Sequence, residues 1–139
     1  MSNIVVILGP VKPSSKIDDK ESQEAADRVG GIDLRFVDNQ QPFDEVLEQC
    51  QGAVMLFPRG SYEHLVKLVE KVGTIKLVQT SSAGTDWLDK SALAELGVNV
   101  ANNGGANAVA VAEHAIGLMF SMYRKFDVQI DSAKNGTWM

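Results

Sequence analysis

A run of small and polar residues at positions 81–86, Ser-Ser-Ala-Gly-Thr-Asp, is the first candidate for binding chemistry. It directly follows an apolar segment, 76–80, that we expect to be a strand. In open α/β sheets, ligands bind beyond the carboxyl ends of the strands. Small residues there let backbone N–H groups approach an anion such as a carboxylate, so Ser82, Ala83 and Gly84 are candidate substrate-binding residues. The same composition is also typical of an ordinary tight turn between a strand and a helix.

Two further side chains could contact an anion. Asn107 follows two glycines and begins a long predicted helix, where free N–H groups and the helix dipole favour a negative charge. Asparagine is also among the best helix N-caps, so a structural role is the alternative. Arg59 comes just after the third predicted strand, and its guanidinium could pair with a carboxylate at the same sheet edge. An exposed arginine on a loop is the alternative there.

The histidines do not form a recognisable catalytic or metal site. Glu113 and His114 are neighbours in the last predicted helix, where adjacent side chains point about 100° apart and do not pair directly. A packing or hinge role is therefore favoured for this pair. His64 lies in a polar helix and is expected at the surface, and the two histidines with Cys50 have no spacing known for a zinc site.

The composition is that of an ordinary soluble globular protein, with 139 residues, 45% hydrophobic and 22% charged. A net charge of −5 argues against a nucleic-acid partner. No apolar run approaches the roughly 20 residues of a membrane span, and the N-terminus has no signal-peptide pattern. A single cysteine excludes an internal disulfide and fits a reducing cytoplasm, although a secreted protein without disulfides would look the same.

Apolar segments of strand type alternate with predicted helices along the chain. The expected strands are 4–8, 32–37, 53–57, 76–80 and 98–101. The expected helices are 21–29, 43–51, a helix capped by Ser61 that runs to about 72, a helix at 90–96 capped by Asp89, and a long helix from 108 to about 134. This alternation predicts an α/β fold with a flavodoxin-like, five-stranded parallel sheet and helices on both faces.

The last predicted helix, at about 26 residues, is twice the usual length and apolar on several sides. Such a helix needs neighbours on several sides, which the preceding 107 residues do not supply. We therefore divide the chain into a domain at 1–106 and a linking helix at 107–139, which belongs partly to a further domain or to a partner chain. A homodimer through residues 108–134 is one expected arrangement.

Three segments, in this order and spacing, resemble the D-isomer-specific 2-hydroxyacid dehydrogenase family. They are Leu-Val-Gln-Thr-Ser-Ser-Ala-Gly-Thr-Asp-Trp-Leu-Asp at 77–89, Leu-Gly-Val-Asn-Val-Ala-Asn at 96–102, and Asn-Ala-Val-Ala-Val-Ala-Glu-His at 107–114. The resemblance is clear over about 53–138 and only architectural before that. It implies the N-terminal, substrate-binding domain of an enzyme in which two α/β domains enclose an active site.

The resemblance also implies roles for the candidate residues. Ser82, Ala83 and Gly84 match a loop whose backbone amides hold the substrate carboxylate in this family. Asn107 matches an asparagine that contacts substrate in some members, and Arg59 lies near a position where some members place a substrate-facing arginine. The substrate implied is a small 2-hydroxy or 2-keto acid.

The cofactor implied is NAD or NADP, but the sequence departs from the family here. In the family, a Gly-x-Gly-x-x-Gly nucleotide-binding domain follows the tryptophan that Trp138 resembles, and the catalytic Arg, Glu and His lie in it. No glycines of this chain have that spacing. We therefore expect no catalytic and no cofactor-binding residue here, and a truncated, catalytically silent chain. The alternative is a stand-alone, non-enzymatic module that binds carboxylates or a partner and dimerises through its C-terminal helix.

Overall fold

The computed structural model describes residues 3–10 and 15–137, with side chains described from 19 onward in the second range. The chain forms two compact units, Met1–Asn103 and Gly104–Met139. We call them the sheet unit and the helical unit and describe each by itself. The resemblance of Trp138 to a family tryptophan falls outside the described residues.

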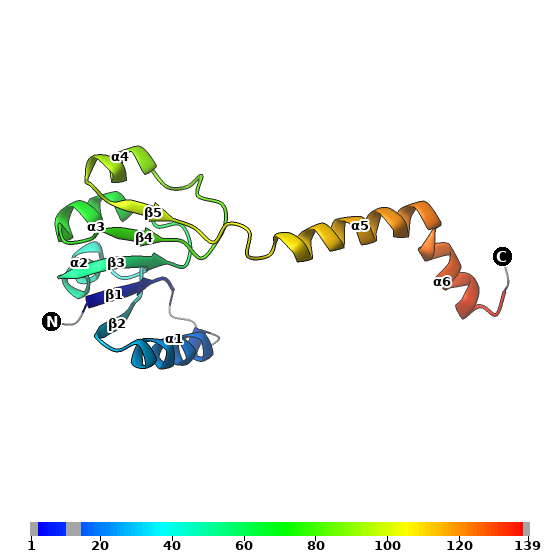
Figure 1. The fold of residues 1–139 in the computed structure, drawn as a ribbon, viewed down its shortest axis with the longest axis horizontal. Coiled ribbons are helices and arrows are strands. Elements are labelled where there is room, and N and C mark those ends of the chain that lie inside the picture. Colours follow the sequence, from blue (N-terminus) through cyan, green and yellow to red (C-terminus); the bar gives the residue numbers. More distant parts are fainter. Residues whose placement is uncertain (1–2, 11–14, 138–139) are drawn as a thin grey trace. The chain divides into compact units, whose positions relative to one another are not determined.

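The sheet unit contains a five-stranded parallel sheet with the strand order β2-β1-β3-β4-β5 (Figure 1). The strands are β1 (Asn3–Leu8), β2 (Ile32–Val37), β3 (Ala53–Pro58), β4 (Leu77–Gln79) and β5 (Asn99–Ala101). This order is the flavodoxin-like one, which confirms the predicted fold class. Each strand end lies within one residue of its predicted position, because the apolar runs that define these strands are short and sharply bounded.

Helices α2 (Phe43–Gln49), α3 (Leu65–Val72) and α4 (Lys90–Glu95) cover one face of the sheet and enclose the main core. Successive strand residues point to opposite faces, so alternate positions share this core. The strands contribute the completely buried Val6, Leu8, Leu56 and Val78, and the helices contribute Val46, Leu65, Leu68 and Leu93. Cys50 is also fully buried here, and desolvation raises the pKa of its thiol to about 11, so it is an inert core residue at neutral pH.

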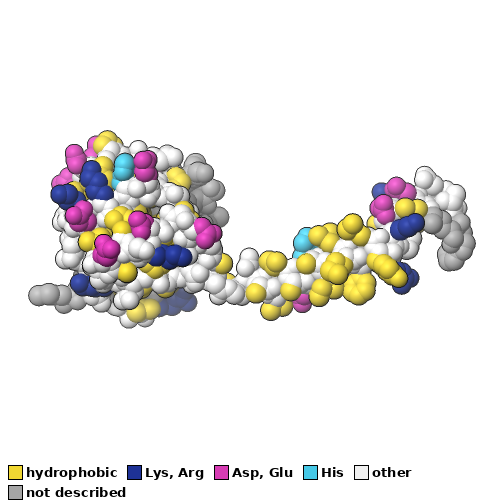
Figure 2. Space-filling view, turned by 90° about the horizontal axis from the view of Figure 1, so that it is seen from above, with side chains coloured by type: hydrophobic (Ala, Val, Ile, Leu, Met, Phe, Trp, Pro, Cys, Tyr) yellow, Lys and Arg dark blue, Asp and Glu magenta, His cyan; other side chains and the backbone are white. Residues whose placement is uncertain are grey.

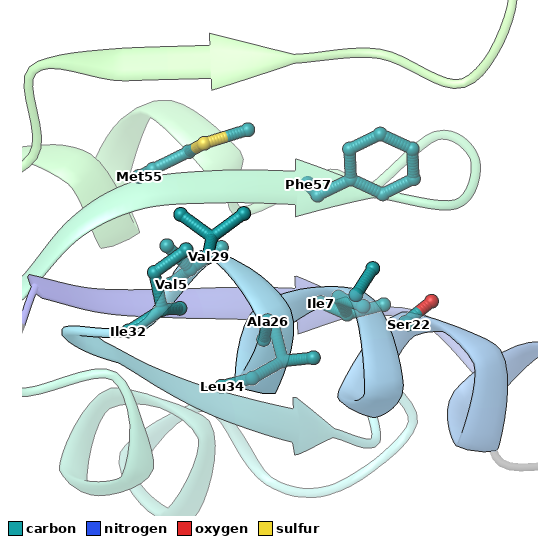
Figure 3. Close-up of a pocket in the computed structure, with 10 residues that line it drawn as sticks. Val5, Ile7, Ser22, Ala26, Val29, Ile32, Leu34, Met55 and Phe57 are labelled. Carbon is teal, nitrogen blue, oxygen red and sulfur yellow. The ribbon is translucent and has the colours of Figure 1, made fainter.

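The opposite face is covered by α1 (Ser15–Val29), which packs beside β2. Figure 3 shows Ala26 and Val29 of this helix beside side chains of β1 and β2, such as Val5 and Leu34. Together with Val5, Met55, Phe57 and other apolar side chains they line a groove of about 410 Å³. This face is therefore less completely filled than the face under α2, α3 and α4.

Two predicted helix starts are wrong. Helix α1 begins at Ser15 instead of residue 21, and the sequence of residues 15–20 has no apolar periodicity to reveal this start. Helix α3 begins at Leu65 with His64 at the N-cap position, so Ser61 is not its cap. The backbone N–H of Leu65 donates to the Tyr62 carbonyl at 3.1 Å, which shows that a turn occupies the residues after Ser61.

The predicted N-cap of α4, Asp89, is confirmed. A carboxylate oxygen of Asp89 accepts a hydrogen bond from the Ala92 N–H at 3.0 Å, which satisfies one of the free donors at the helix start. Gly97 ends the helix with a φ of 71°, a left-handed conformation that glycine adopts without a Cβ penalty. The turn then leads directly into β5.

The helical unit contains the long predicted helix, but in two parts: α5 (Ala108–Arg124) and α6 (Phe126–Lys134). Between them Lys125 has a φ of 51°, which is unusual for a residue with a Cβ atom. The Gln129 side-chain amide donates to the Arg124 carbonyl at 2.6 Å and so satisfies an oxygen freed by the break. A single continuous helix to residue 134 was therefore a wrong prediction.

Neither α5 nor α6 contains a buried residue. Figure 2 shows apolar side chains along this part of the chain. Eleven large apolar residues are exposed by 39% to 85%: Val109, Val111, Ile116, Leu118, Met119, Phe120, Met122, Tyr123, Phe126, Val128 and Ile130. Across the described ranges 3–10 and 15–137, none of the helices combines the length and the apolar character that crossing a bilayer requires.

Replacing Leu56 with Ala should lower the free energy of unfolding of the sheet unit by about 2–5 kcal/mol, because the side chain is completely buried in the central strand. The control, Leu96→Ala, changes a side chain that is 40% exposed and should cost less than about 1 kcal/mol. Urea unfolding followed by circular dichroism measures both. Equal costs for the two substitutions would contradict the core described above.

Candidate functional site

The loop that contains Ser82, Ala83 and Gly84 leaves the sheet at the carboxyl end of β4, and all three residues are exposed. Strand β4 lies between β3 and β5, so the loop has neighbouring strands on both sides. Its base is fixed at Thr80, which is 1% exposed and whose N–H donates to the Ala101 carbonyl at 2.9 Å. A ligand at this loop would be bound by a segment whose start is firmly part of the sheet.

Side chains hold the carbonyl groups of the loop. The hydroxyl of Thr80 donates to the Ser82 carbonyl at 2.8 Å, and the hydroxyl of Ser82 donates to the Gly84 carbonyl at 2.9 Å. The Asn102 amide, which follows β5, donates to the Ala83 carbonyl at 2.7 Å. These three bonds turn successive carbonyl oxygens toward protein donors.

Asn103 adds two weaker contacts to the same loop. Its backbone N–H donates to the Ser82 carbonyl at 3.2 Å, and its side-chain amide donates to the Ser81 carbonyl at 3.4 Å. Thr80, Asn102 and Asn103 were not among the residues that sequence reasoning selected. The available signal was the pair of asparagines directly after β5, the strand next to the loop.

The backbone N–H groups of the loop have no hydrogen-bond acceptor among the described residues. Within residues 3–10 and 15–137, the N–H groups of Ser82, Ala83 and Gly84 donate no hydrogen bond, whereas the carbonyl groups of the same residues each accept at least one. A series of exposed N–H groups on a tethered loop is suited to an anion, because each contributes a partial positive charge at a fixed position. The loop can therefore bind a carboxylate without using a charged side chain.

Arg59 lies at the same edge of the sheet, after β3. Leu56 of β3 pairs with Val78 of β4, and Arg59 and Ser81 each lie three residues beyond that pair. Because the strands are parallel and about 4.8 Å apart, both segments leave the sheet side by side. The Arg59 backbone N–H donates to the Leu8 carbonyl of β1 at 2.8 Å, so its main chain is also fixed to the sheet.

The sequence analysis gave an exposed loop arginine as the alternative for Arg59. The structure differs, because the Arg59 side chain is mostly buried. Its Nη2 lies 2.6 Å from Oδ1 of Asp19 in α1, and both side chains are 22% exposed. Its guanidinium carbon is 5.9 Å from the centre of the Phe36 ring. Arg59 is thus a half-buried, paired cation whose described side-chain partners lie in α1 and β2.

The other polar residues considered in the sequence lie on other elements. Asn107 belongs to the helical unit, where it occupies the N-cap position of α5 but its side chain makes no capping hydrogen bond. Glu113 and His114 are exposed on α5. His64 is exposed as predicted, with its ring edge-to-face against Phe43 at 5.7 Å and against Tyr62 at 5.8 Å.

Comparison with known proteins identifies the class to which this fold and loop belong. Residues 5–135 match the family described as D-isomer specific 2-hydroxyacid dehydrogenase, catalytic domain. The match covers most of the chain. The chain therefore belongs to the D-isomer specific 2-hydroxyacid dehydrogenase family, which confirms the resemblance seen in the three sequence segments.

Curated relatives carry several different names. The chain is 36% identical over 89 residues to erythronate-4-phosphate dehydrogenase of Pseudoalteromonas atlantica, covering 64% of this chain and 24% of the relative. It is 27% identical over 119 residues to D-3-phosphoglycerate dehydrogenase of Archaeoglobus fulgidus, covering 84% and 22%. It is 26% identical over 122 residues to glycerate dehydrogenase of Methylorubrum extorquens, covering 86% and 38%. The chain thus spans well under half of each relative's length.

Solved structures agree on the fold. A 2-hydroxyacid dehydrogenase from Ketogulonicigenium vulgare Y25 superposes with a TM-score of 0.67 at 18% identity, covering 98% of this chain and 41% of that one. A 3-phosphoglycerate dehydrogenase from Entamoeba histolytica with bound NAD+ gives 0.63 at 22% identity, covering 90% and 40%. At these identities the likeness supports the fold alone.

Replacing Thr80 with Val should loosen the loop, because it removes a buried hydroxyl that donates to the Ser82 carbonyl. We expect a loss of about 1 kcal/mol in the free energy of unfolding. We also expect faster hydrogen exchange, measured by NMR, at the Asn103 amide, because its N–H donates to the same Ser82 carbonyl. Thr80→Ser retains the donor and is the matched control. If Val and Ser behave alike in both measurements, the hydroxyl does not tether the loop.

Proposed function

We propose that this chain is the substrate-binding part of an NAD(P)-dependent D-2-hydroxyacid dehydrogenase. The N–H groups of Ser82, Ala83 and Gly84 would hold the substrate carboxylate in this function. The observation that carries the proposal is the polarity of the loop, in which the carbonyl groups are tied back and the N–H groups remain as donors. Family membership supports the same assignment.

The contribution of this chain to the reaction is binding and orientation. A carboxylate held by two or three fixed N–H groups positions the adjacent C2 carbon and its oxygen, which lowers the entropic cost of reaching the transition state. Arg59, whose side chain runs past Gly9 to Asp19, and Asn107 are proposed as further substrate contacts. NAD(P) would exchange the hydride with C2 in the complete enzyme.

The described residues do not fit the nucleotide itself. In dinucleotide-binding folds, the turn after the first strand contains glycines whose open faces admit a pyrophosphate. Here the turn after β1 has Gly9, and a Cβ atom at Gly9 would lie 2.9 Å from the Cβ of Arg59. The space beside Gly9 is thus filled by Arg59, and Pro10 has no N–H to donate. We propose that nucleotide binding and the catalytic Arg, Glu and His are supplied from outside these residues.

The substrate is proposed to be a small 2-hydroxy or 2-keto acid. The relatives' names include acids with a phosphate, erythronate-4-phosphate and 3-phosphoglycerate, and acids without one, glycerate and hydroxypyruvate. Identity to the two groups is similar, at 36% and 27% for the first and 26% and 30% for the second. Sequence identity therefore does not choose between them.

Titration of the 139-residue chain tests the proposed division of roles. We expect 2-keto acids such as pyruvate and hydroxypyruvate to shift the amide resonances of Ser82, Ala83 and Gly84 at about millimolar concentration, since only part of the binding site is present. We expect no heat from NADH in calorimetry and no turnover. Tight NADH binding would contradict the proposal that the nucleotide site lies elsewhere.

The second candidate function is a non-enzymatic module that dimerises through the helical unit. The exposed apolar side chains of α5 and α6 favour it, since contiguous apolar surface of this kind marks an interaction site. A homodimer through residues 108–134 is compatible with the dehydrogenase function as well. A cytoplasmic location is part of the proposal and is supported by Cys50, a buried free thiol.

If α5 mediates dimerisation, the chain should sediment as a dimer and Met122→Lys should shift it toward monomer. Met122 is 81% exposed, so a lysine there is easily hydrated in the monomer but must be desolvated at an apolar interface. His114→Lys, at an exposed polar position of the same helix, is the control and should remain dimeric. A monomeric wild-type chain, or equal behaviour of both variants, would exclude this interface.

A further inference from the structure

Three neighbours restrict the conformation of the Arg59 side chain: Asp19, Phe36 and Gly9. Asp19 accepts a hydrogen bond from its Nη2 at 2.6 Å, and the Phe36 ring lies 5.9 Å from its guanidinium carbon. Gly9 supplies the third constraint, because a Cβ atom there would lie 2.9 Å from the Arg59 Cβ and 3.4 Å from its Cγ and Cδ. The side chain is therefore directed along Gly9 and toward α1.

The charge of this arginine is compensated within the chain. The Arg59 and Asp19 side chains are each 22% exposed, so their pairing is less screened by water than a surface ion pair. The pair as a whole carries no net charge. A dianionic phosphate that approached Arg59 would meet the Asp19 carboxylate in the same place, and would have to repel or displace it.

We propose that Asp19 is a specificity-determining residue, acting through Arg59 to favour substrates with an uncharged, hydroxyl-bearing end over phosphorylated ones. A hydroxyl suits the pair because it can accept from a guanidinium N–H and donate to a carboxylate oxygen. The inference rests on the proposed function, since it assumes that the substrate carboxylate binds at the neighbouring loop. It assigns a role to Asp19 that neither the loop nor the family match supplies.

The pair lies at the carboxyl edge of the sheet, on the far side of β3 from the loop. The Arg59 backbone leaves β3 beside the start of the loop that follows β4, and its side chain runs the other way, past Gly9 to Asp19. A substrate whose carboxylate is held by the loop would reach the pair by extending its other end across the carboxyl end of β3. Within this edge, Asp19 is the residue that determines whether Arg59 presents a net positive charge.

The test compares D-glycerate with D-3-phosphoglycerate, which differ by the phosphate, on the 139-residue chain by NMR titration. The wild type should bind the two acids with dissociation constants within about threefold of each other. Asp19→Asn should tighten 3-phosphoglycerate binding by about tenfold, the effect of one freed charge-assisted contact, and leave glycerate within about twofold. Asp19→Glu should restore the wild-type ratio.

The matched control is Asp27→Asn, which removes the same charge from an exposed position of the same helix. It should leave the ratio unchanged, since it does not touch Arg59. A ratio that is the same in wild type and Asp19→Asn would overturn the proposal. The proposal would also be overturned if the wild type bound 3-phosphoglycerate more than about tenfold more tightly than glycerate. This measurement tests the proposal even if Asp19→Asn does not fold.

Failure of the proposed function would be recognised separately. If neither acid shifts the amides of Ser82, Ala83 and Gly84, the carboxylate site is wrong, but the effect of Asp19 on Arg59 remains measurable with inorganic phosphate. Phosphate should shift the Arg59 side-chain N–H resonances in Asp19→Asn and not in the wild type. Shifts of equal size in both proteins would show that Asp19 does not neutralise Arg59.

Discussion

The parallel pairing of β3, β4 and β5 is the constraint on which the candidate site depends. Because parallel strands all end at one edge, the segments that follow them must leave the sheet together. Arg59 after β3, the loop after β4 and Asn102 after β5 are brought to that edge by this rule. The hydrogen bond from the Thr80 N–H to the Ala101 carbonyl extends the β4–β5 ladder to the base of the loop. The first residue of the loop is therefore fixed by the sheet.

The sequence predicts the elements that are defined by nearby apolar residues, and it fails to predict helix ends that no local residue type marks. Strands such as β3, at Ala53–Pro58, follow from short apolar runs bounded by glycine and proline, and their ends are correct within a residue. The early start of α1 could not be read in the same way, because residues 15–20 have no apolar periodicity. The break at Lys125 was also hidden, since neither glycine nor proline marks a residue that adopts φ of 51°.

The same distinction applies to the site. The loop at 82–84 was located from its small residues and its place after a strand, but the bonds that orient it join residues about twenty positions apart, such as Asn102 and Ala83. Arg59 is a candidate from the sequence, whereas its partner Asp19 lies 40 residues earlier, before the predicted start of the first helix at residue 21. Because the start of α1 was placed too late, the pairing of these two residues was beyond sequence reasoning.

In the proposed function, backbone N–H groups bind the substrate carboxylate, and side chains recognise the rest of the substrate. The N–H groups of residues 82–84 are present whatever the side chains are, so a loop of this kind binds the carboxylate that all 2-hydroxy acids share and cannot distinguish among them. Discrimination then has to come from side chains at the same sheet edge, where Asp19 and Arg59 lie. On that proposal, a change of a few side chains at this edge would change the preferred acid with little change in overall sequence identity, which agrees with relatives of similar identity being named for phosphorylated and unphosphorylated acids.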